Sequence, residues 1–295
     1  MKVRGGREIM RLSYNVMSMN VFRNYSETSK VNSKALSRIS SGSKIMSAKD
    51  NPNKLGQSEG FKLQIRGLQA AQRNVQDGAS MMQTFDGALD GVSESLIRMR
   101  ELVVKAGNST NTEEDKKVIQ KEIEEIKNGI DDLAKNTEFN GVKLIGGNGV
   151  NDNRFPGTIK TASGANVGES IDIPKYNVGS DFLSDATGKN TIRALDISNG
   201  DIDKALETID YSMNTINEIR GKFGALETSF TNLSKNFEEN NIMLGRAQGN
   251  IEGADIAKEM MEFTRTNILI EAANAMIAQT NNLPNDALKV LERIN

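Results

Sequence analysis

Two pairs of adjacent carboxylates are the side chains of this sequence best suited to chemistry. Glu124-Glu125 and Asp131-Asp132 each supply the two acids that glycoside hydrolysis requires, one to protonate the leaving group and one to attack or stabilise. The first of these acids needs a pocket that raises its pKa, and nothing in the neighbouring sequence indicates such a pocket. Both pairs also lie among apolar residues at helical spacing. We therefore interpret them as the solvated face of an amphipathic helix.

A second candidate is the glycine-rich run Gly146-Gly147-Asn148-Gly149, which suits a loop that wraps a phosphate group. The Lys-Ser/Thr that completes a phosphate loop does not follow it, so a turn is the better interpretation. The 295 residues contain no Cys, no His and no Trp. Ser-His-Asp triads, HExxH zinc sites and thiolate chemistry are therefore impossible within them. We predict that the protein is not an enzyme and has no catalytic residue, cofactor or metal.

Charge and hydropathy exclude further classes of partner. The chain has 37 basic and 39 acidic residues, a formal net charge of −2. A nucleic-acid-binding surface usually shows a positive excess, so no nucleic-acid partner is expected. The sequence has no apolar run of about 18 residues, so no membrane insertion is expected. Residues 1–9 are followed by no apolar segment, so no cleaved signal peptide is expected. Arg4-Gly-Gly-Arg7 is what a translated ribosome-binding site would encode, and we expect Met10 to be the true initiator.

The elements that would carry these residues are long helices with apolar stripes. An apolar residue recurs at every seventh position from 61 to 103, which lines one seam of a helix, and again from 202 to 251. Neither stripe fits inside a compact globule, so we predict that the two helices pair antiparallel as a coiled coil. The stripes are Phe61, Leu68, Val75, Met82, Leu89, Leu96 and Val103, and Ile202, Ile209, Ile216, Phe223, Phe230, Phe237, Leu244 and Ile251.

Turn signals place the element boundaries. Ser40-Ser41-Gly42 predicts the end of a first, weak helix, and Pro52 suits the start of the long one, which is expected to stop at Gly107. Asn111 followed by Glu114 predicts the N-cap of a third helix that ends near Asn136.

Beyond that helix the pattern changes. Asn140-Gly141 predicts a hairpin over 139–144, because Asn-Gly is the strongest short turn signal. A glycine-rich stretch with short alternating pieces follows. The last helix, which begins after Gly253, is expected to pause at Pro284.

The sequence thus predicts a mainly α protein, a long antiparallel helical bundle or coiled coil with a β-hairpin and a small β-rich or irregular central insert. Residues 10–52 and 253–295 are predicted to form terminal helices. Residues 53–145 and 192–252 are predicted to form a rod-like helical core, and 146–191 a short, surface-exposed, variable insert.

The terminal helices carry apolar stripes for which the core offers no internal partner of adequate size. Such a stripe can bury itself internally, meet a copy of the chain or lie on a membrane surface, and the last requires a rim of Lys and Arg that is scarce here. We therefore predict self-association. The thirteen Met residues include several on the stripes, where thioethers suit repacking seams and ordinary cores equally. The predicted self-association residues are Leu12, Val16, Met19, Phe22, Ile256, Met260, Phe263, Ile270 and Ile277.

Motifs near both ends point to a family. The N-terminal ones are Leu36-Ser-Arg-Ile-Ser-Ser-Gly42, Ile65-Arg-Gly-Leu68, Arg98-Met-Arg-Glu-Leu102 and Phe139-Asn-Gly-Val-Lys-Leu144. The C-terminal ones are Ala257-Lys-Glu-Met-Met-Glu-Phe-Thr264, Asn267-Ile-Leu269 and Ala272-Ala-Asn-Ala-Met-Ile-Ala-Gln279. In their order they resemble bacterial flagellins over about 10–145 and 195–291. Lys49-Asp-Asn-Pro-Asn-Lys54 departs from the small, acidic run usual in that family.

The resemblance implies a structural, self-polymerising subunit of the extracellular flagellar filament, which serves motility. It implies export in the unfolded state without a cleaved signal peptide, and assembly at the filament tip. The terminal helices would form the inner tube and the long helices the outer wall. The implied partners are other flagellin subunits, an export chaperone, the filament cap and the hook-associated proteins.

The resemblance also implies contact with a toll-like innate immune receptor through Arg98, Leu102 and Glu122, although packing and helix capping explain the last two equally well. Three alternatives remain at this point. A hook–filament junction protein shares the same terminal helices. A flagellin with a metalloprotease insert would need a longer insert and His residues. A cytoplasmic coiled-coil adaptor would leave the terminal motifs unexplained.

Overall fold

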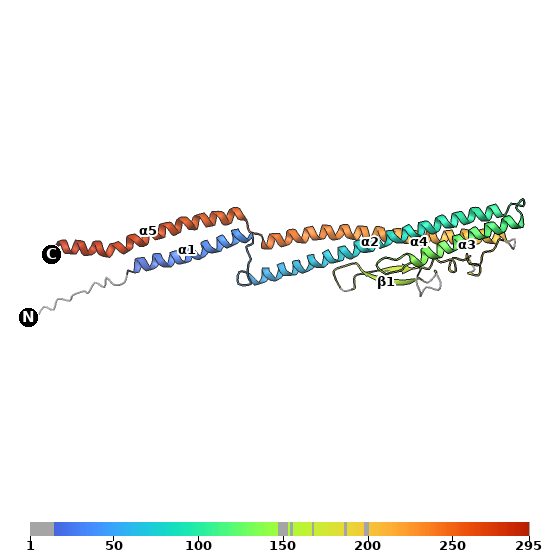
Figure 1. Ribbon diagram of the computed structural model, residues 1–295. Coiled ribbons are helices and arrows are strands. Elements are labelled where there is room, and N and C mark those ends of the chain that lie inside the picture. The colour runs from blue at the N-terminus through green and yellow to red at the C-terminus, as the bar shows by residue number, and fades with distance from the viewer. Residues whose placement is uncertain are drawn as a thin grey trace, which may run out of the picture. The chain divides into compact units, whose positions relative to one another are not determined.

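The computed structural model describes residues 15–146, 153, 156–166, 168–185, 188–197 and 201–294, with side chains as far as residue 282. Met10, Leu12 and the loop residues Gly147-Asn148-Gly149 lie outside the described residues. The elements within them are α1 (Val16–Ser41), α2 (Pro52–Ala106), α3 (Glu113–Asn136), β1 (Gly157–Ala162), β2 (Ser170–Lys175), α4 (Ile202–Glu252) and α5 (Ile256–Ile294) (Figure 1). The predicted mainly α class is confirmed.

The chain divides into two compact units. One comprises Met1–Lys62 and Gly245–Asn295 and is called the terminal unit below; the other, Leu63–Leu244, is called the central unit. The terminal unit contains α1 and α5 with the nearest ends of α2 and α4. The central unit contains the rest of the two long helices with α3, β1 and β2.

Most helix ends lie where the turn signals predict them. α1 ends at Ser41 because Gly42 adopts a left-handed conformation (φ 67°) and its N–H donates to the carbonyl of Arg38. α2 begins at Pro52, whose missing N–H has no role in the first turn.

The predicted N-cap of α3 is wrong by one residue. Thr112 caps the helix: its hydroxyl accepts from the N–H of Asp115, and the Asp115 carboxylate accepts from the N–H of Thr112. Asn111 instead donates its side-chain amide to the carbonyl of Lys105, at 2.6 Å, and so closes the turn that leaves α2.

The predicted pause at Pro284 is also wrong, because α5 continues through it to Ile294. A single Pro removes one N–H donor, and a helix can curve around the lost hydrogen bond without ending.

The central unit is built on the predicted antiparallel pair of stripes. Arg100 of α2 contacts Asp210 of α4 at 2.8 Å, and Gln83, earlier in α2, contacts Glu227, later in α4, at 2.7 Å. The two helices therefore run in opposite directions. The stripes are fully buried from Val75 to Val103 and from Ile209 to Phe230. The predicted antiparallel pairing of α2 with α4 is confirmed.

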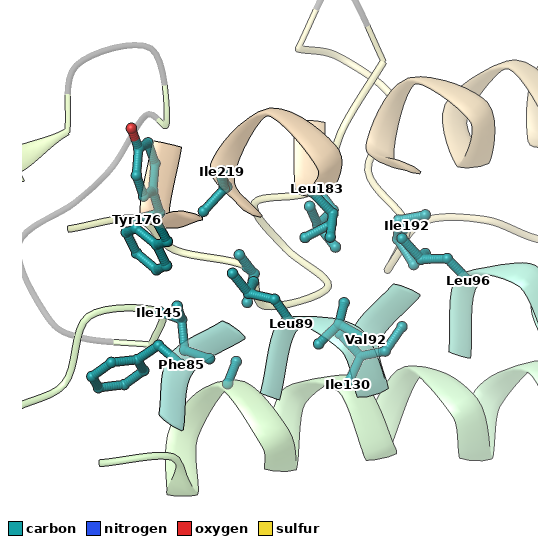
Figure 2. Close-up of a cluster of buried hydrophobic side chains, with 14 of the residues drawn as sticks. Phe85, Leu89, Val92, Leu96, Ile130, Ile145, Tyr176, Leu183, Ile192 and Ile219 are labelled. Atoms are coloured by element: carbon teal, nitrogen blue, oxygen red, sulfur yellow. The ribbon is translucent and has the colours of Figure 1, made fainter. Parts of the chain in front are cut away.

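A third layer, which the stripes do not reveal, closes this core. Figure 2 shows Leu89 and Val92 of α2, Ile130 of α3 and Ile219 of α4 together with Ile145, Tyr176, Leu183 and Ile192 of the connecting chain. All of these side chains are buried in one cluster. The expectation that 146–191 is surface-exposed is therefore wrong for its second half, which supplies apolar residues to the core as well as β2.

Two turns give this connection its shape. Phe139 and Val142 exchange two backbone hydrogen bonds of 2.9 Å around Asn140 and Gly141, both with positive φ, which is the predicted tight turn. The longer hairpin lies within the insert. It pairs β1 with β2 antiparallel, from Gly157 opposite Lys175 to Ala162 opposite Ser170.

Candidate assembly surface

Helices α1 and α5 lie side by side and antiparallel in the terminal unit, joined along a seam of small and polar residues (Figure 1). The side chains buried between or beside them are Ala35 of α1 and Thr266, Ala273 and Thr280 of α5. Small side chains let two helix backbones approach closely. A Thr hydroxyl can donate its hydrogen bond to a backbone carbonyl of its own helix. Thr266 does so, by donating to the carbonyl of Glu262 at 2.8 Å.

Asn32 provides the main polar contact of this seam. Its side-chain amide lies 2.9 Å from Oγ1 of Thr266, 2.8 Å from Oδ1 of Asn267 and 3.3 Å from the carbonyl of Phe263, all of them acceptors on α5. At the N-terminus of α1, the side-chain amide of Asn15 donates to the carbonyl of Thr280 at 2.7 Å. Side-chain hydrogen bonds therefore fix the register of α1 against α5.

Most of the large apolar side chains of the pair are exposed instead, whereas Phe263, Ile270 and Ile277 are half-buried. The usual arrangement buries large apolar residues in the seam and leaves polar residues facing solvent. Many exposed large apolar side chains on one helix pair indicate an interaction site. The exposed apolar residues are Val16, Met17, Met19, Phe22, Val31 and Leu36 on α1, and Ile256, Met260, Met261, Ile268, Leu269 and Met276 on α5; we call them the outer apolar surface.

Five of the nine predicted self-association residues belong to this surface: Val16, Met19, Phe22, Ile256 and Met260. Phe263, Ile270 and Ile277 are half-buried, and Leu12 lies outside the described residues.

Sequence reasoning missed seven members, although a signal for some was present. Met261 and Ile268 are seven residues apart, and so are Leu269 and Met276. They form a second stripe beside the predicted one. A helix with a single partner needs only one stripe, and the second stripe of α5 is exposed.

Backbone hydrogen bonds and one ion pair hold together the two connectors of the terminal unit, which join α1 to α2 and α4 to α5. The Lys44 N–H donates to the carbonyl of Glu252 at 2.7 Å, and the Ala254 N–H donates to that of Gly42 at 2.9 Å. The Glu252 carboxylate at the end of α4 accepts from Nζ of Lys62, at 2.8 Å, and from the buried hydroxyl of Ser58. These two contacts, led by Lys62, hold the pKa of Glu252 below its usual value.

A cleft of about 480 Å³ opens beside these connectors, and three of the charged residues that line it, Arg38, Asp50 and Glu259, form ion pairs. Arg38 pairs with Glu259 at 3.1 Å and Lys34 with Asp50 at 2.9 Å. The hydrogen bond from Lys34 lowers the pKa of Asp50. Over the described residues, no group of three or more acidic side chains is arranged to hold a metal ion. No described helix combines the length and the apolar character needed to cross a membrane.

The carboxylate pairs of α3 do not form an acid pair. Glu124, Glu125 and Asp132 are exposed, whereas Asp131 is buried and saturated with donors. It accepts from the backbone N–H of Ser180 at 2.7 Å and from the guanidinium of Arg193 at 2.9 Å. Its role is to attach the segment that contains Ser180 and Arg193, called the returning chain below, to α3.

Lys127, one turn earlier on α3, makes a similar attachment. Its buried ammonium donates to the backbone carbonyls of Arg193 (3.2 Å) and Leu195 (2.6 Å), and burial lowers its pKa.

The three residues singled out for receptor contact are arranged unequally. Arg98 and Glu122 are exposed and paired at 2.7 Å between α2 and α3, and this contact, followed by Glu101, raises the pKa of Arg98. Leu102 is only 2% exposed and packs in the core, so it cannot present its side chain to a partner.

Comparison with known proteins identifies the relatives of this chain. The model of the bacterial flagellin N-terminal helical region matches residues 12–149, and that of the C-terminal helical region matches residues 206–291. The flagellin of Halalkalibacterium halodurans is 36% identical over 282 residues, and that of Bacillus subtilis is 34% identical over 303. Each alignment covers 96% of this chain and 100% of the relative.

A solved structure assigned to a flagellar hook-associated protein of Vibrio parahaemolyticus has a similar fold. It aligns with a TM-score of 0.59 at 17% identity, covering 69% of this chain and 100% of that one. At this identity the likeness concerns the fold alone.

Proposed function

The chain belongs to the bacterial flagellin family, and on that premise we propose that the outer apolar surface of α1 and α5 is where its subunits meet when they polymerise. As a flagellin it is a structural subunit of the extracellular flagellar filament and not an enzyme.

The observation that carries the proposal is the exposure of large apolar side chains on the terminal pair. Asn32, Arg38 and the buried Ala and Thr side chains contribute to its seam, while Phe263, Ile270 and Ile277 are only half-buried. The twelve large side chains outside are therefore free to bury themselves against copies of the chain. Each side chain of this size contributes about 1.5–3 kcal/mol when fully buried, so a few per subunit are enough to drive association.

The division of labour along the chain follows from this assignment. We assign 10–52 and 253–295 to the polymerisation domain that lines the inner tube. Residues 53–145 and 192–252 form the helical core, and 146–191 the variable insert. The boundary between the compact units lies about ten residues later in α2 than this assignment, and about ten residues earlier in α4. The first turns of α2 and the last turns of α4 therefore belong to the same unit as α1 and α5.

We also propose that the subunit is exported unfolded without a cleaved signal peptide, bound by an export chaperone, and added beneath the filament cap, with hook-associated proteins at the filament base. A seam held largely by side-chain hydrogen bonds, with only small side chains fully buried, suits a segment that must cross a channel unfolded and order itself on its neighbours.

The hook–filament junction alternative is less well supported. Its one favourable observation is the likeness to a hook-associated structure, which concerns the fold alone, whereas the relatives at 34–36% identity are flagellins. A filament subunit should dominate the protein sheared from the cell surface, and a junction protein should be scarce there.

Receptor binding remains a narrower proposal. The exposed Arg98–Glu122 pair can contact a toll-like receptor, whereas Leu102 can act only by supporting the helix surface from within. In a reporter assay with monomer, Arg98→Ala should weaken the response. Arg100 lies on the same helix as Arg98 and forms an exposed pair with Asp210 of α4, so Arg100→Ala is the matched control and should not weaken the response. Equal responses of both variants and wild type would exclude the proposed contact.

The experiment that tests the assembly surface is seeded polymerisation. Purified full-length monomer and a form that lacks the residues before Asn53 and after Gly253 are each mixed with filament seeds and viewed by electron microscopy. We expect the full chain to elongate the seeds and the truncated form to remain monomeric. Equal assembly of both would show that the ends do not polymerise.

A point variant localises the effect without removing either helix. Val16→Asp places a carboxylate on the outer apolar surface at a position 59% exposed in the monomer, so the monomer should fold normally while elongation is lost. Val118→Asp makes the same change at a position 67% exposed on α3 and should leave elongation intact. Far-ultraviolet circular dichroism of both monomers checks their folding.

A further inference from the structure

Most of the exposed methionines in the described part of the chain lie on the two terminal helices, and the other two exposed ones are Met46 and Met243. Five belong to the outer apolar surface of the terminal unit and are 41–68% exposed: Met17, Met19, Met260, Met261 and Met276. Three in the central unit, Met81, Met82 and Met99, are at most 7% exposed. Thioethers therefore account for five of the twelve large apolar side chains on the surface assigned to assembly, and those of the central core are sheltered from solvent.

We propose that oxidation of these five methionines by hydrogen peroxide blocks assembly of the subunit and leaves its central core intact. The inference rests on the proposed function of the outer apolar surface. It assigns that surface a second property, sensitivity to a two-electron oxidant.

The chemistry requires only access to sulfur. A lone pair of the thioether attacks one oxygen of hydrogen peroxide and the O–O bond breaks. That oxygen stays on sulfur as a sulfoxide, and the other leaves as water once a proton has been transferred to it. Sulfur loses two electrons and the peroxide gains them. Accessible side chains react first, so Met261 is oxidised while Met82 is protected by the core.

The consequence follows from burial. A thioether is apolar and adapts to an irregular contact, whereas a sulfoxide is a strong hydrogen-bond acceptor. When two subunits meet, a sulfoxide must be buried against apolar neighbours without a donor. One unsatisfied acceptor of this kind weakens the addition of a subunit by about tenfold, and several in one interface act together.

The same burial makes the effect specific to free subunits. In the monomer the five methionines are exposed to solvent, but in a filament formed through this surface the neighbouring copies would cover them. Peroxide should therefore mark subunits that have not yet assembled and spare those already in the filament.

The test compares seeded elongation before and after oxidation. Full-length monomer is treated with hydrogen peroxide, freed of the reagent and mixed with seeds, and peptide mass spectrometry locates the sulfoxides. We expect elongation of the oxidised wild type to fall by about tenfold or more. Treatment with methionine sulfoxide reductases for both sulfoxide epimers should restore it. Unchanged elongation of oxidised wild type would overturn the proposal.

A variant assigns the effect to the five sulfurs. Replacing all five by Leu preserves an apolar side chain of similar size, so this variant should elongate seeds equally with and without peroxide. Met243→Leu changes a methionine that is 58% exposed in the central unit and should stay as sensitive as wild type. If the five-Leu variant lost elongation on oxidation to the same degree as wild type, other residues would be responsible and the proposal would fail.

Protection in the polymer gives a second measurement that needs no variant. Peroxide added to preformed wild-type filaments should leave the five methionines unoxidised under conditions that oxidise them in the monomer. Equal oxidation in both forms would show that assembly does not cover them, and would overturn the inference. If untreated wild type failed to elongate seeds, the assembly role itself would be refuted, and this inference with it.

Discussion

The buried carboxylate of Asp131 offers the sharpest test of how the central unit is held together, because an exposed carboxylate stands next to it. We expect Asp131→Ala to lower the free energy of unfolding by about 2–3 kcal/mol. Asp132→Ala removes the same group from the exposed side of α3 and should change it by less than about 0.5 kcal/mol.

The magnitude follows from what each partner of Asp131 loses. The N–H of Ser180 donates to Asp131 at 2.7 Å, and Ser180 is completely buried, so without the carboxylate this N–H has no acceptor. An unsatisfied buried donor costs about 1–3 kcal/mol. The guanidinium of Arg193 donates at 2.9 Å, but its side chain is more than half exposed, so water can replace that contact for about 1 kcal/mol at most.

The assay is urea unfolding of both variants, with hydrogen exchange of the backbone to localise the change. Asp131→Ala should unfold at a lower urea concentration with an unchanged slope, because the surface exposed on unfolding is the same. Residues 177–185 should exchange faster, whereas the amides of α2 should not. Equal midpoints for the two variants would refute the argument that Asp131 attaches the returning chain.

Two further predictions concern close packing and acid stability. Gly78→Ala should destabilise the folded protein by about 1–3 kcal/mol, because the added Cβ would lie 3.1–3.3 Å from three atoms of the Phe230 ring. Gly87→Ala has open space around its Cβ and should stabilise α2 by up to about 1 kcal/mol. Calorimetry of both variants checks the two values. Ionised Glu252 stabilises the fold above its ordinary pKa of 4.5, because Lys62 holds its pKa lower in the folded protein, and this stability is lost as the pH falls through the lowered value. The melting temperature of Glu252→Gln should therefore fall less than that of wild type between neutral pH and about pH 3. Parallel curves of melting temperature against pH would contradict this.

The helical framework could be predicted from the sequence because its causes are local. Seven-residue spacing places Val75 to Val103 on one face whatever the rest of the chain does, and Gly42 and Pro52 act on the backbone at their own positions. Pairing of α2 with α4 then follows, because each stripe is the only one long enough to cover the other.

Contacts that depend on non-periodic segments could not be predicted in this way. The residues that complete the central core, such as Tyr176 and Leu183, come from irregular chain whose spacing carries no sign of burial. The N-cap of α3 was misplaced because Asn111 and Thr112 are both good caps, and the choice depended on the turn out of α2.

The outer apolar surface was predicted in part for a related reason. The apolar pattern of a helix shows which residues seek burial but not what buries them. In α1 and α5 the internal partner takes a seam marked by Asn32, Thr266 and the small residues, which no hydropathy pattern reveals. The single predicted stripe of α5 therefore covered only part of the outer apolar surface. Its prediction omitted Met261, Ile268, Leu269 and Met276.

Under the proposed function, the two units separate folding from assembly. The central core closes on its own large side chains, so changes at Asp131 or Gly78 should shift the unfolding of the monomer without altering which surfaces meet. The terminal pair keeps its seam through polar contacts that association does not need to disrupt. Its outer side chains can therefore be buried in the filament without first being taken out of the monomer. An assembly subunit gains from this arrangement, because the apolar energy that would have stabilised the free monomer remains available to stabilise the polymer.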